Sequence, residues 1–135
     1  MSRLYTPEIL GAATSLAVWP WDDALPLRGE ARSRTCGSVI RLGLAVDPAG
    51  AIVRIGIRAQ ACAIGQAAAH GFAQGAGGRT RGEIAVARAA LGAWLASDAE
   101  LPSWPGLSPI AAARDYPSRH GAIVLAWDAA LDALS

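Results

Sequence analysis

Two short segments, each with one cysteine, hold the residues of this 135-residue chain that are best suited to chemistry. Cys36 precedes Gly37, a residue that lets a ligand approach the backbone closely. Cys62 falls where a helix is expected to begin, and the positive end of a helix favours the thiolate form. The thiolate is the form that reacts with metals and persulfide sulfur. The alternative for each cysteine is a small buried hydrophobic residue.

The chain has two histidines. His120, expected in the first turn of the last helix, could supply a third ligand through an imidazole nitrogen, or it could be an exposed or capping residue. His70 lies two turns after Cys62 and is predicted at the surface. Ser38 is expected to bond a backbone amide rather than a metal. A different possibility is a thiol enzyme, with Cys36 or Cys62 as the nucleophile and His120 as its base.

Composition limits the class of protein. A hydrophobic fraction of 53% and a charged fraction of 17% favour a packed protein over a disordered one, and the length predicts a single domain over residues 1–135. The net charge of +1 favours neither nucleic acid nor an anionic membrane as a partner. All basic residues are arginines, which excludes a lysine Schiff base.

The same sequence features predict a cytoplasmic protein. No apolar run reaches the roughly 18 residues that a membrane span needs, and the first residues lack the pattern of a secretory signal. Two cysteines in a cytoplasmic chain favour metal, cluster or sulfur chemistry over a disulfide framework.

The first half of the chain predicts one helix and a small antiparallel sheet. Thr6 and Pro7 should begin a helix that ends before Trp19, because Pro20 disfavours helix at the residue before it. A short first strand is expected near residues 30–34. Alternation of period two predicts strands over 39–46 and 52–59, joined by a turn at 47–50. The tip of this hairpin would lie far from both cysteines.

The second half predicts helices. One should run from about Cys62 to Gln74, and Thr80 with Glu83 forms a capping box that begins another. A short helix is expected over 108–114, and a final helix should begin after Tyr116, with Ser118 near its cap. Together these elements predict an α+β fold with a small three-stranded antiparallel sheet and helices packed on one face.

Three ordered motifs resemble the NifU, IscU and SufU type of iron-sulfur cluster assembly scaffold. The first is Cys36-Gly37-Ser38-Val39, which leads into a strand, and the second is Ala61-Cys62-Ala63-Ile64-Gly65, where a helix begins. The third is Tyr116-Pro117-Ser118-Arg119 followed by Leu125-Ala126-Trp127. The resemblance covers most of the chain in the family's order, and it implies the fold of the NifU N-terminal domain.

The resemblance also implies a set of ligands. Members of this family hold a transient [2Fe-2S] cluster or zinc with three cysteines and an aspartate, and they receive sulfur from a cysteine desulfurase. Cys36 and Cys62 match two of these cysteines. The aspartate falls at Ser38 and the third cysteine at Ala122. The lysine or histidine that usually precedes the third cysteine would be Gly121, so His120 stands one position away.

The expected function is therefore a non-enzymatic, scaffold-like protein that works with a cysteine desulfurase or a client apo-protein. Three arrangements stay open. Cys36, Cys62 and His120 could hold a metal or cluster with one open position. Two chains of a homodimer could share a [2Fe-2S] cluster, each supplying both cysteines. Finally, the protein could have lost the cluster and kept only the surface that meets the desulfurase or client.

Overall fold

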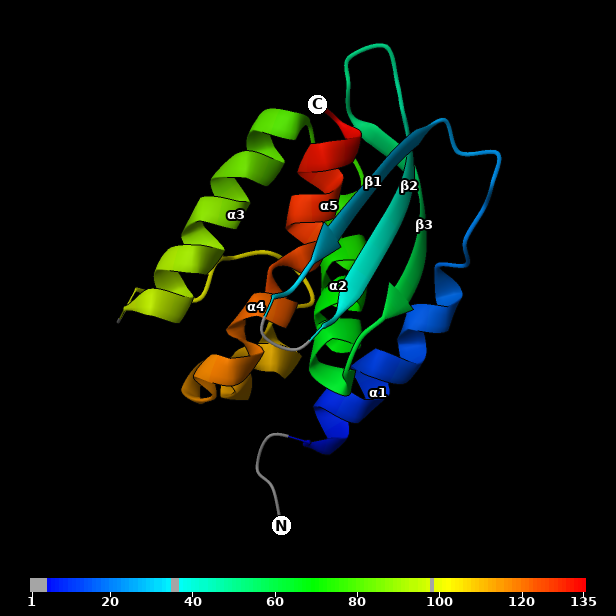
Figure 1. The fold of residues 1–135 in the computed structure, drawn as a ribbon. Helices are drawn as coiled ribbons and strands as arrows, with labels where there is room; N and C mark the ends of the chain where they lie inside the picture. Colours follow the sequence, from blue (N-terminus) through cyan, green and yellow to red (C-terminus); the bar gives the residue numbers. More distant parts are fainter. Residues whose placement is uncertain (1–4, 35–36, 98) are drawn as a thin grey trace.

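The fold is built on a three-stranded antiparallel sheet with helices over one face (Figure 1). The computed structural model describes residues 5–34, 37–97 and 99–135. The strands β1 (Leu27–Arg32), β2 (Val39–Val46) and β3 (Ile52–Gln60) are hydrogen-bonded in the order β1-β2-β3. The predicted α+β fold is confirmed, although β1 begins earlier than the sequence suggested.

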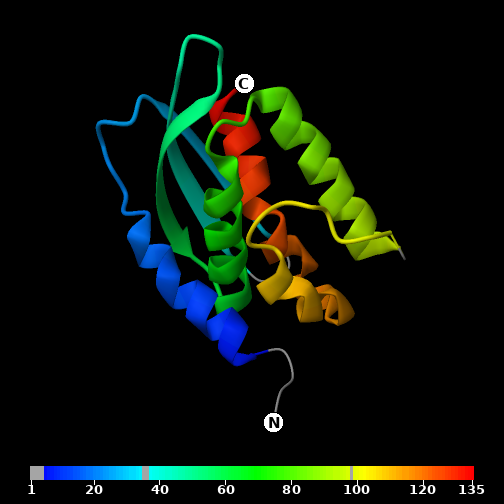
Figure 2. The ribbon, with the colours of Figure 1, turned by 180° about the vertical axis from the view of Figure 1, so that it is seen from behind.

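The helices form a layer on the inner face of the sheet. α5 (Leu125–Ala133) packs on β1 and β2, and α2 (Ala63–Ala76) lies beside it and contacts β3. α1 (Pro7–Ser15) packs against α2, and α3 (Arg81–Ala96) packs against α5 (Figures 1 and 2). The remaining helical pieces are α4 (His120–Ile123) and the 3-10 turns η1 (Leu16–Val18), η2 (Ser108–Asp115) and η3 (Pro117–Arg119).

The alternation in β2 produces the centre of the core. Ile40, Leu42 and Leu44 point to the helices and are fully buried. Residues 20–25 cover the outer face around Gly43 and Gly56. There the glycines leave room for the loop, because a Cβ on Gly43 would lie 3.1 Å from the Leu25 Cβ, and one on Gly56 would lie 2.8 Å from the Pro20 carbonyl.

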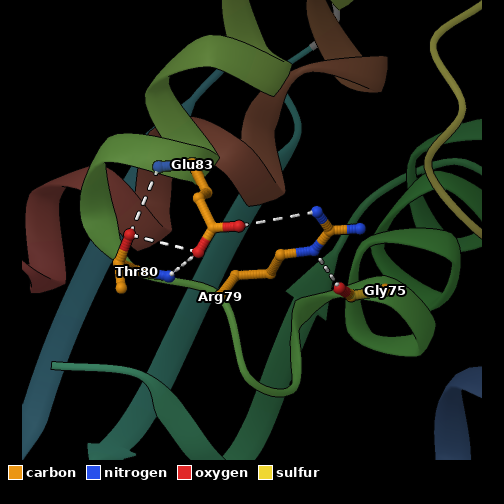
Figure 3. A network of polar contacts seen from close by, with 4 residues as sticks. All are labelled: Gly75, Arg79, Thr80 and Glu83. Carbon is orange, nitrogen blue, oxygen red and sulfur yellow. Dashed lines mark hydrogen bonds and ion pairs between the residues drawn. The ribbon is translucent and has the colours of Figure 1, made fainter. Parts of the chain in front are cut away.

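The predicted capping box at the start of α3 is confirmed (Figure 3). The Thr80 amide donates to Glu83 Oε1 at 3.1 Å, and the Glu83 amide donates to Thr80 Oγ1 at 3.5 Å. Arg79 extends this network back to α2, since its Nε donates to the Gly75 carbonyl at 3.0 Å and its Nη1 lies 3.9 Å from Glu83 Oε2. The network fixes the turn between the two helices.

The prediction of one continuous final helix is wrong. The segment is divided into η3, α4 and α5, and Val124 lies between the last two with φ −88° and ψ −8°. The side chain of Ser118 provides no cap, because neither η3 nor α4 has a side-chain cap hydrogen bond. Both α pieces contact α2, but α5 packs mainly on the strands β1 and β2. Packing thus outweighs a helical periodicity that is continuous in the sequence.

His70 of α2 is not the surface residue that the sequence predicted. Its ring is partly buried, and its Nδ1 accepts a hydrogen bond from Trp19 Nε1 at 3.0 Å. The Trp19 carbonyl in turn accepts from the Ile57 amide at 2.9 Å. His70 therefore helps to hold the segment after η1 between α2 and the sheet. Burial lowers the pKa of His70.

Within the part of the chain that the structure describes, no helix is both long enough and apolar enough to cross a membrane. The cytoplasmic location and the single domain over residues 1–135 stay predictions.

Gly29 of β1 gives a test of the contact between sheet and helix. A Cβ at this position would overlap the Ala129 carbonyl and the Ala133 amide of α5. We expect Gly29→Ala to lower the free energy of unfolding by about 1–3 kcal/mol in urea denaturation, because backbone atoms must move. Gly11→Ala in α1 is the control, since nothing lies within 4 Å of the added Cβ. It should leave stability unchanged or raise it by up to about 1 kcal/mol. Equal effects of the two changes would contradict this packing.

His70 predicts a pH dependence of stability. Because its pKa is lowered in the folded protein, the unfolded chain binds the proton more readily. The free energy of unfolding should be highest above the ordinary value of 6.5 and should fall as the pH drops below it, until the folded protein is protonated as well. Protonation of Nδ1 also removes the acceptor for Trp19. Urea denaturation at a series of pH values should show this decline in the wild type and a weaker one in His70→Gln. An unchanged slope in the variant would assign the decline to other groups.

Candidate metal and cluster site

The segments that carry the two cysteines meet at one end of the sheet. Val39 pairs with Arg32 on one side and with Gln60 on the other. The connection between β1 and β2 therefore lies beside the junction between β3 and α2, at the end opposite the β2–β3 turn (Figure 1). Cys36 belongs to this connection in sequence but lies outside the described residues, so its predicted role as a ligand is untested.

Hydrogen bonds close the described part of the β1–β2 connection. The Ser33 amide donates to the Ser38 carbonyl at 2.8 Å, and the Gly37 amide donates to the Ser33 carbonyl at 3.2 Å. Gly37 adopts a φ of +70°, a conformation that favours glycine over other residues. Ser38 is only 3% exposed. The residue that the sequence resemblance matched to the family's aspartate is thus a buried serine.

The sequence placed Cys62 in the first turn of α2, but the structure shows that it is the N-cap of this helix. Its backbone is extended (φ −65°, ψ 170°), and its carbonyl accepts from the Gln66 amide at 3.0 Å. Gln66 also donates through its side chain to the Ala61 carbonyl at 2.9 Å. Cys62 is a free, partly buried cysteine that makes no side-chain capping bond. Its thiol is therefore available at the positive end of a helix of 14 residues.

Ala122 of α4 packs against the same turn of α2. It is 1% exposed, and a Cβ on Gly65 would lie 3.5 Å from the Ala122 Cβ and 3.8 Å from the Ala122 carbonyl. Gly65 is three residues after Cys62. The structure thus brings Ala122 and the helix start at Cys62 into the same region.

His120 begins α4, and its Nε2 lies 2.7 Å from the Arg114 carbonyl. A carbonyl only accepts hydrogen bonds, so Nε2 is the donor in this contact and Nδ1 is the ring nitrogen left for another partner. Metal-binding histidines are commonly oriented by such a bond to a backbone carbonyl. Among the described residues, no group of three His, Cys, Asp or Glu side chains could hold a metal ion. Cys36 is not among these residues.

One set of residues at this end was not recognised as a group from the sequence. Arg32, Arg41 and Arg58 come together on the outer face of the sheet, from three different strands. The period-two pattern placed Arg41 and Arg58 opposite the apolar side chains of their strands, but only the register shows that they are neighbours.

The comparisons with known proteins rest on structure. No family model and no curated protein matches the sequence. Among solved structures, the chain is similar to the N-terminal part of a nitrogen-fixing NifU-like protein from Brucella abortus. The two share 27% identity over 96% of this chain and 91% of that one, with a TM-score of 0.86.

A second similar structure is that of a protein assigned as an iron-sulfur cluster assembly scaffold for the SUF system, from the thermophile Fervidobacterium islandicum. It shares 21% identity with this chain, covers 98% of it and 97% of its own length, and has a TM-score of 0.82. At this identity the likeness shows the fold alone. The chain is a NifU/SufU-like protein in its fold, and the resemblance that its sequence motifs suggested is confirmed.

Proposed function

We propose that this protein is an iron-sulfur cluster assembly scaffold-like protein that binds an iron-sulfur cluster or zinc through a reduced set of ligands. Cys36 and Cys62 supply the thiolates, and His120 assists through Nδ1. The role is non-enzymatic, and the cluster is cargo that passes to a client apo-protein after sulfur arrives from a cysteine desulfurase.

The observation that carries the proposal is the position of Cys62 within this fold. A free cysteine occupies the N-cap position of α2, at the end of the sheet where the β1–β2 connection also lies. The likeness in fold to a NifU-like protein, which extends over 96% of the chain, supports this proposal.

Some of the residues at this site are suitable metal ligands, and others are not. A thiolate and a neutral imidazole nitrogen are ligands that zinc accepts, and thiolates hold iron-sulfur clusters. The bond between His120 and the Arg114 carbonyl leaves Nδ1 as the nitrogen able to bind metal. Ser38 and Ala122 supply neither the carboxylate nor the third thiolate of the family. The remaining ligands would come from solvent or from a second chain of a homodimer.

A second candidate function is favoured by the burial of the two substituted positions. Ser38 and Ala122 are 3% and 1% exposed, and even a Cβ added to Gly65 would meet the Ala122 Cβ at 3.5 Å, an ordinary packing distance. A protein without a cluster could keep this arrangement and act as an adaptor for the desulfurase or the client. Metal binding distinguishes the two functions.

Removal of single ligands tests the proposal. The wild type is expected to show cluster absorbance after anaerobic reconstitution with iron and sulfide, and to bind zinc in a titration. Cys36→Ser and Cys62→Ser should lose the absorbance and most of the zinc affinity, because a hydroxyl is a poor substitute for a thiolate. His120→Gln should weaken zinc binding, whereas His70→Gln is the matched control and should not.

The wild type decides between the two functions. If it binds neither metal nor cluster, the binding proposal is wrong, and a pull-down with a cysteine desulfurase then tests the adaptor.

Ala122→Cys tests whether position 122 lies close enough to the metal site for a thiol there to act as the third ligand. A thiol placed beside Gly65 should raise zinc affinity by about tenfold or more, because a third thiolate joins the set. Ala96→Cys adds an exposed thiol at the end of α3 and is the matched control. Equal zinc affinities in the two variants would show that Ala122 does not lie at the metal site.

A further inference from the structure

The outer face of the sheet is open at the end near Cys62. Residues 20–25 cover the part that lies over Gly43 and Gly56. Nearer to Cys62, the outer face has a hollow of about 240 Å³. It is lined by three arginines and two other residues, namely Arg32, Arg41, Arg58, Val39 and Gln60.

The register of the strands places like charges opposite each other in this hollow. Arg41 of β2 pairs with Arg58 of β3 on one side and with Glu30 of β1 on the other. Like charges directly opposite in a sheet are destabilising. Glu30 offsets part of this repulsion, since Arg41 Nε donates to Glu30 Oε1 at 2.6 Å and Arg32 Nε lies 3.6 Å from Glu30 Oε2. The hydrogen bond from Arg41 is the main reason why the pKa of Glu30 is lowered.

Arg58 is held in position by an aromatic ring. Its Cζ lies 4.8 Å from the centre of the Trp21 ring, and Trp21 Nε1 donates to Asp23 Oδ1 at 2.7 Å. Among the residues that the structure describes, no carboxylate lies within ion-pair distance of Arg58. The hollow thus has three guanidinium groups and one carboxylate at its edge, an excess of two positive charges.

We propose that this arginine hollow binds carboxylate side chains from an acidic segment of a partner protein. A guanidinium presents paired N–H donors that match the two oxygens of a carboxylate, and the ring contact of Arg58 already orders one of these groups. The hollow is smaller than the roughly 300 Å³ at which drug-sized ligand pockets begin, so it suits one or two side chains.

The charge pattern favours an acidic protein segment over a nucleic acid. A polynucleotide is held by an extended basic surface, whereas this chain has a net charge of +1 and places Glu30 beside the arginines. Val39 and Gln60 of the hollow lie at the same end of the sheet as Ser38 and Cys62. A partner bound here would therefore stand beside the cysteine-bearing end, but the binding itself needs no metal.

A labelled hexaglutamate peptide is a direct probe for the metal-free, full-length protein. Its fluorescence anisotropy should rise with the wild type at low ionic strength and should rise less as salt is added. The double variant Arg32→Gln/Arg58→Gln should bind about tenfold or more weakly, since two of the charged donors are lost. Arg58→Lys keeps the charge without the paired donors and should bind with intermediate affinity. Circular dichroism checks that each variant is folded.

Arg81→Gln is the matched control, because it removes an exposed arginine at the start of α3. It should bind the peptide as the wild type does. The proposal is overturned if the wild type does not bind, if Arg81→Gln loses as much affinity as the double variant, or if hexaglutamine binds equally well. Tighter binding of an oligothymidylate of equal charge, or displacement of the peptide by equimolar inorganic phosphate, would also overturn it. Because no metal is present, failure here leaves the proposal on metal binding intact.

Discussion

The burial of α2 is the constraint on which the rest of the structure depends. This helix contacts α1, α4, α5, η2 and β3, and most of its residues are buried. Such crowding requires small side chains. A Cβ on Gly71 would lie 2.5 Å from the Gly106 carbonyl, and one on Gly75 would collide with the Trp104 ring. The glycines therefore set how closely the later segments approach the helix.

The aromatic side chains complete the core around this helix. Phe72 stacks on Trp104 at 5.6 Å between ring centres and meets Trp127 edge-on at 5.2 Å. Trp104 Nε1 donates to the carbonyls of Gly71 and Phe72, at 3.0 and 3.2 Å. These contacts attach the connection after α3 and the start of α5 to α2. α4 lies between these two segments in sequence, so the same packing also brings Ala122 of α4 close to Gly65 of α2.

Much of the fold could be predicted because its signals are local. The alternation around Leu42 predicted β2, and Thr80 with Glu83 predicted the start of α3. The signals that failed depend on distant contacts. The break at Val124 is decided by what α4 and α5 pack against, and the bond from Trp19 to His70 joins residues 51 positions apart. No local pattern contains that information.

For the candidate site too, the features that depend on local sequence could be predicted, and those that depend on distant contacts could not. Cys62 at a helix start could be inferred from the change of periodicity, but its status as the N-cap required coordinates. The contact of His120 with the Arg114 carbonyl depends on the 3-10 turn η2, which contains Arg114, and on η3, which follows it; periodicity predicts neither turn. The arginine hollow depends on register across three strands. Register is a relation between segments, so a single segment cannot show it.

The alanines of α2 have a further consequence for Cys62. An alanine loses no side-chain rotamer freedom when it is buried, so ordering this helix costs mainly backbone entropy. The packing of the helix against its neighbours offsets this loss of backbone entropy when the chain folds. The backbone at the N-cap is then already ordered before any ligand arrives. A group that binds the thiol would meet a preorganised backbone and would lose little affinity to the ordering of the protein.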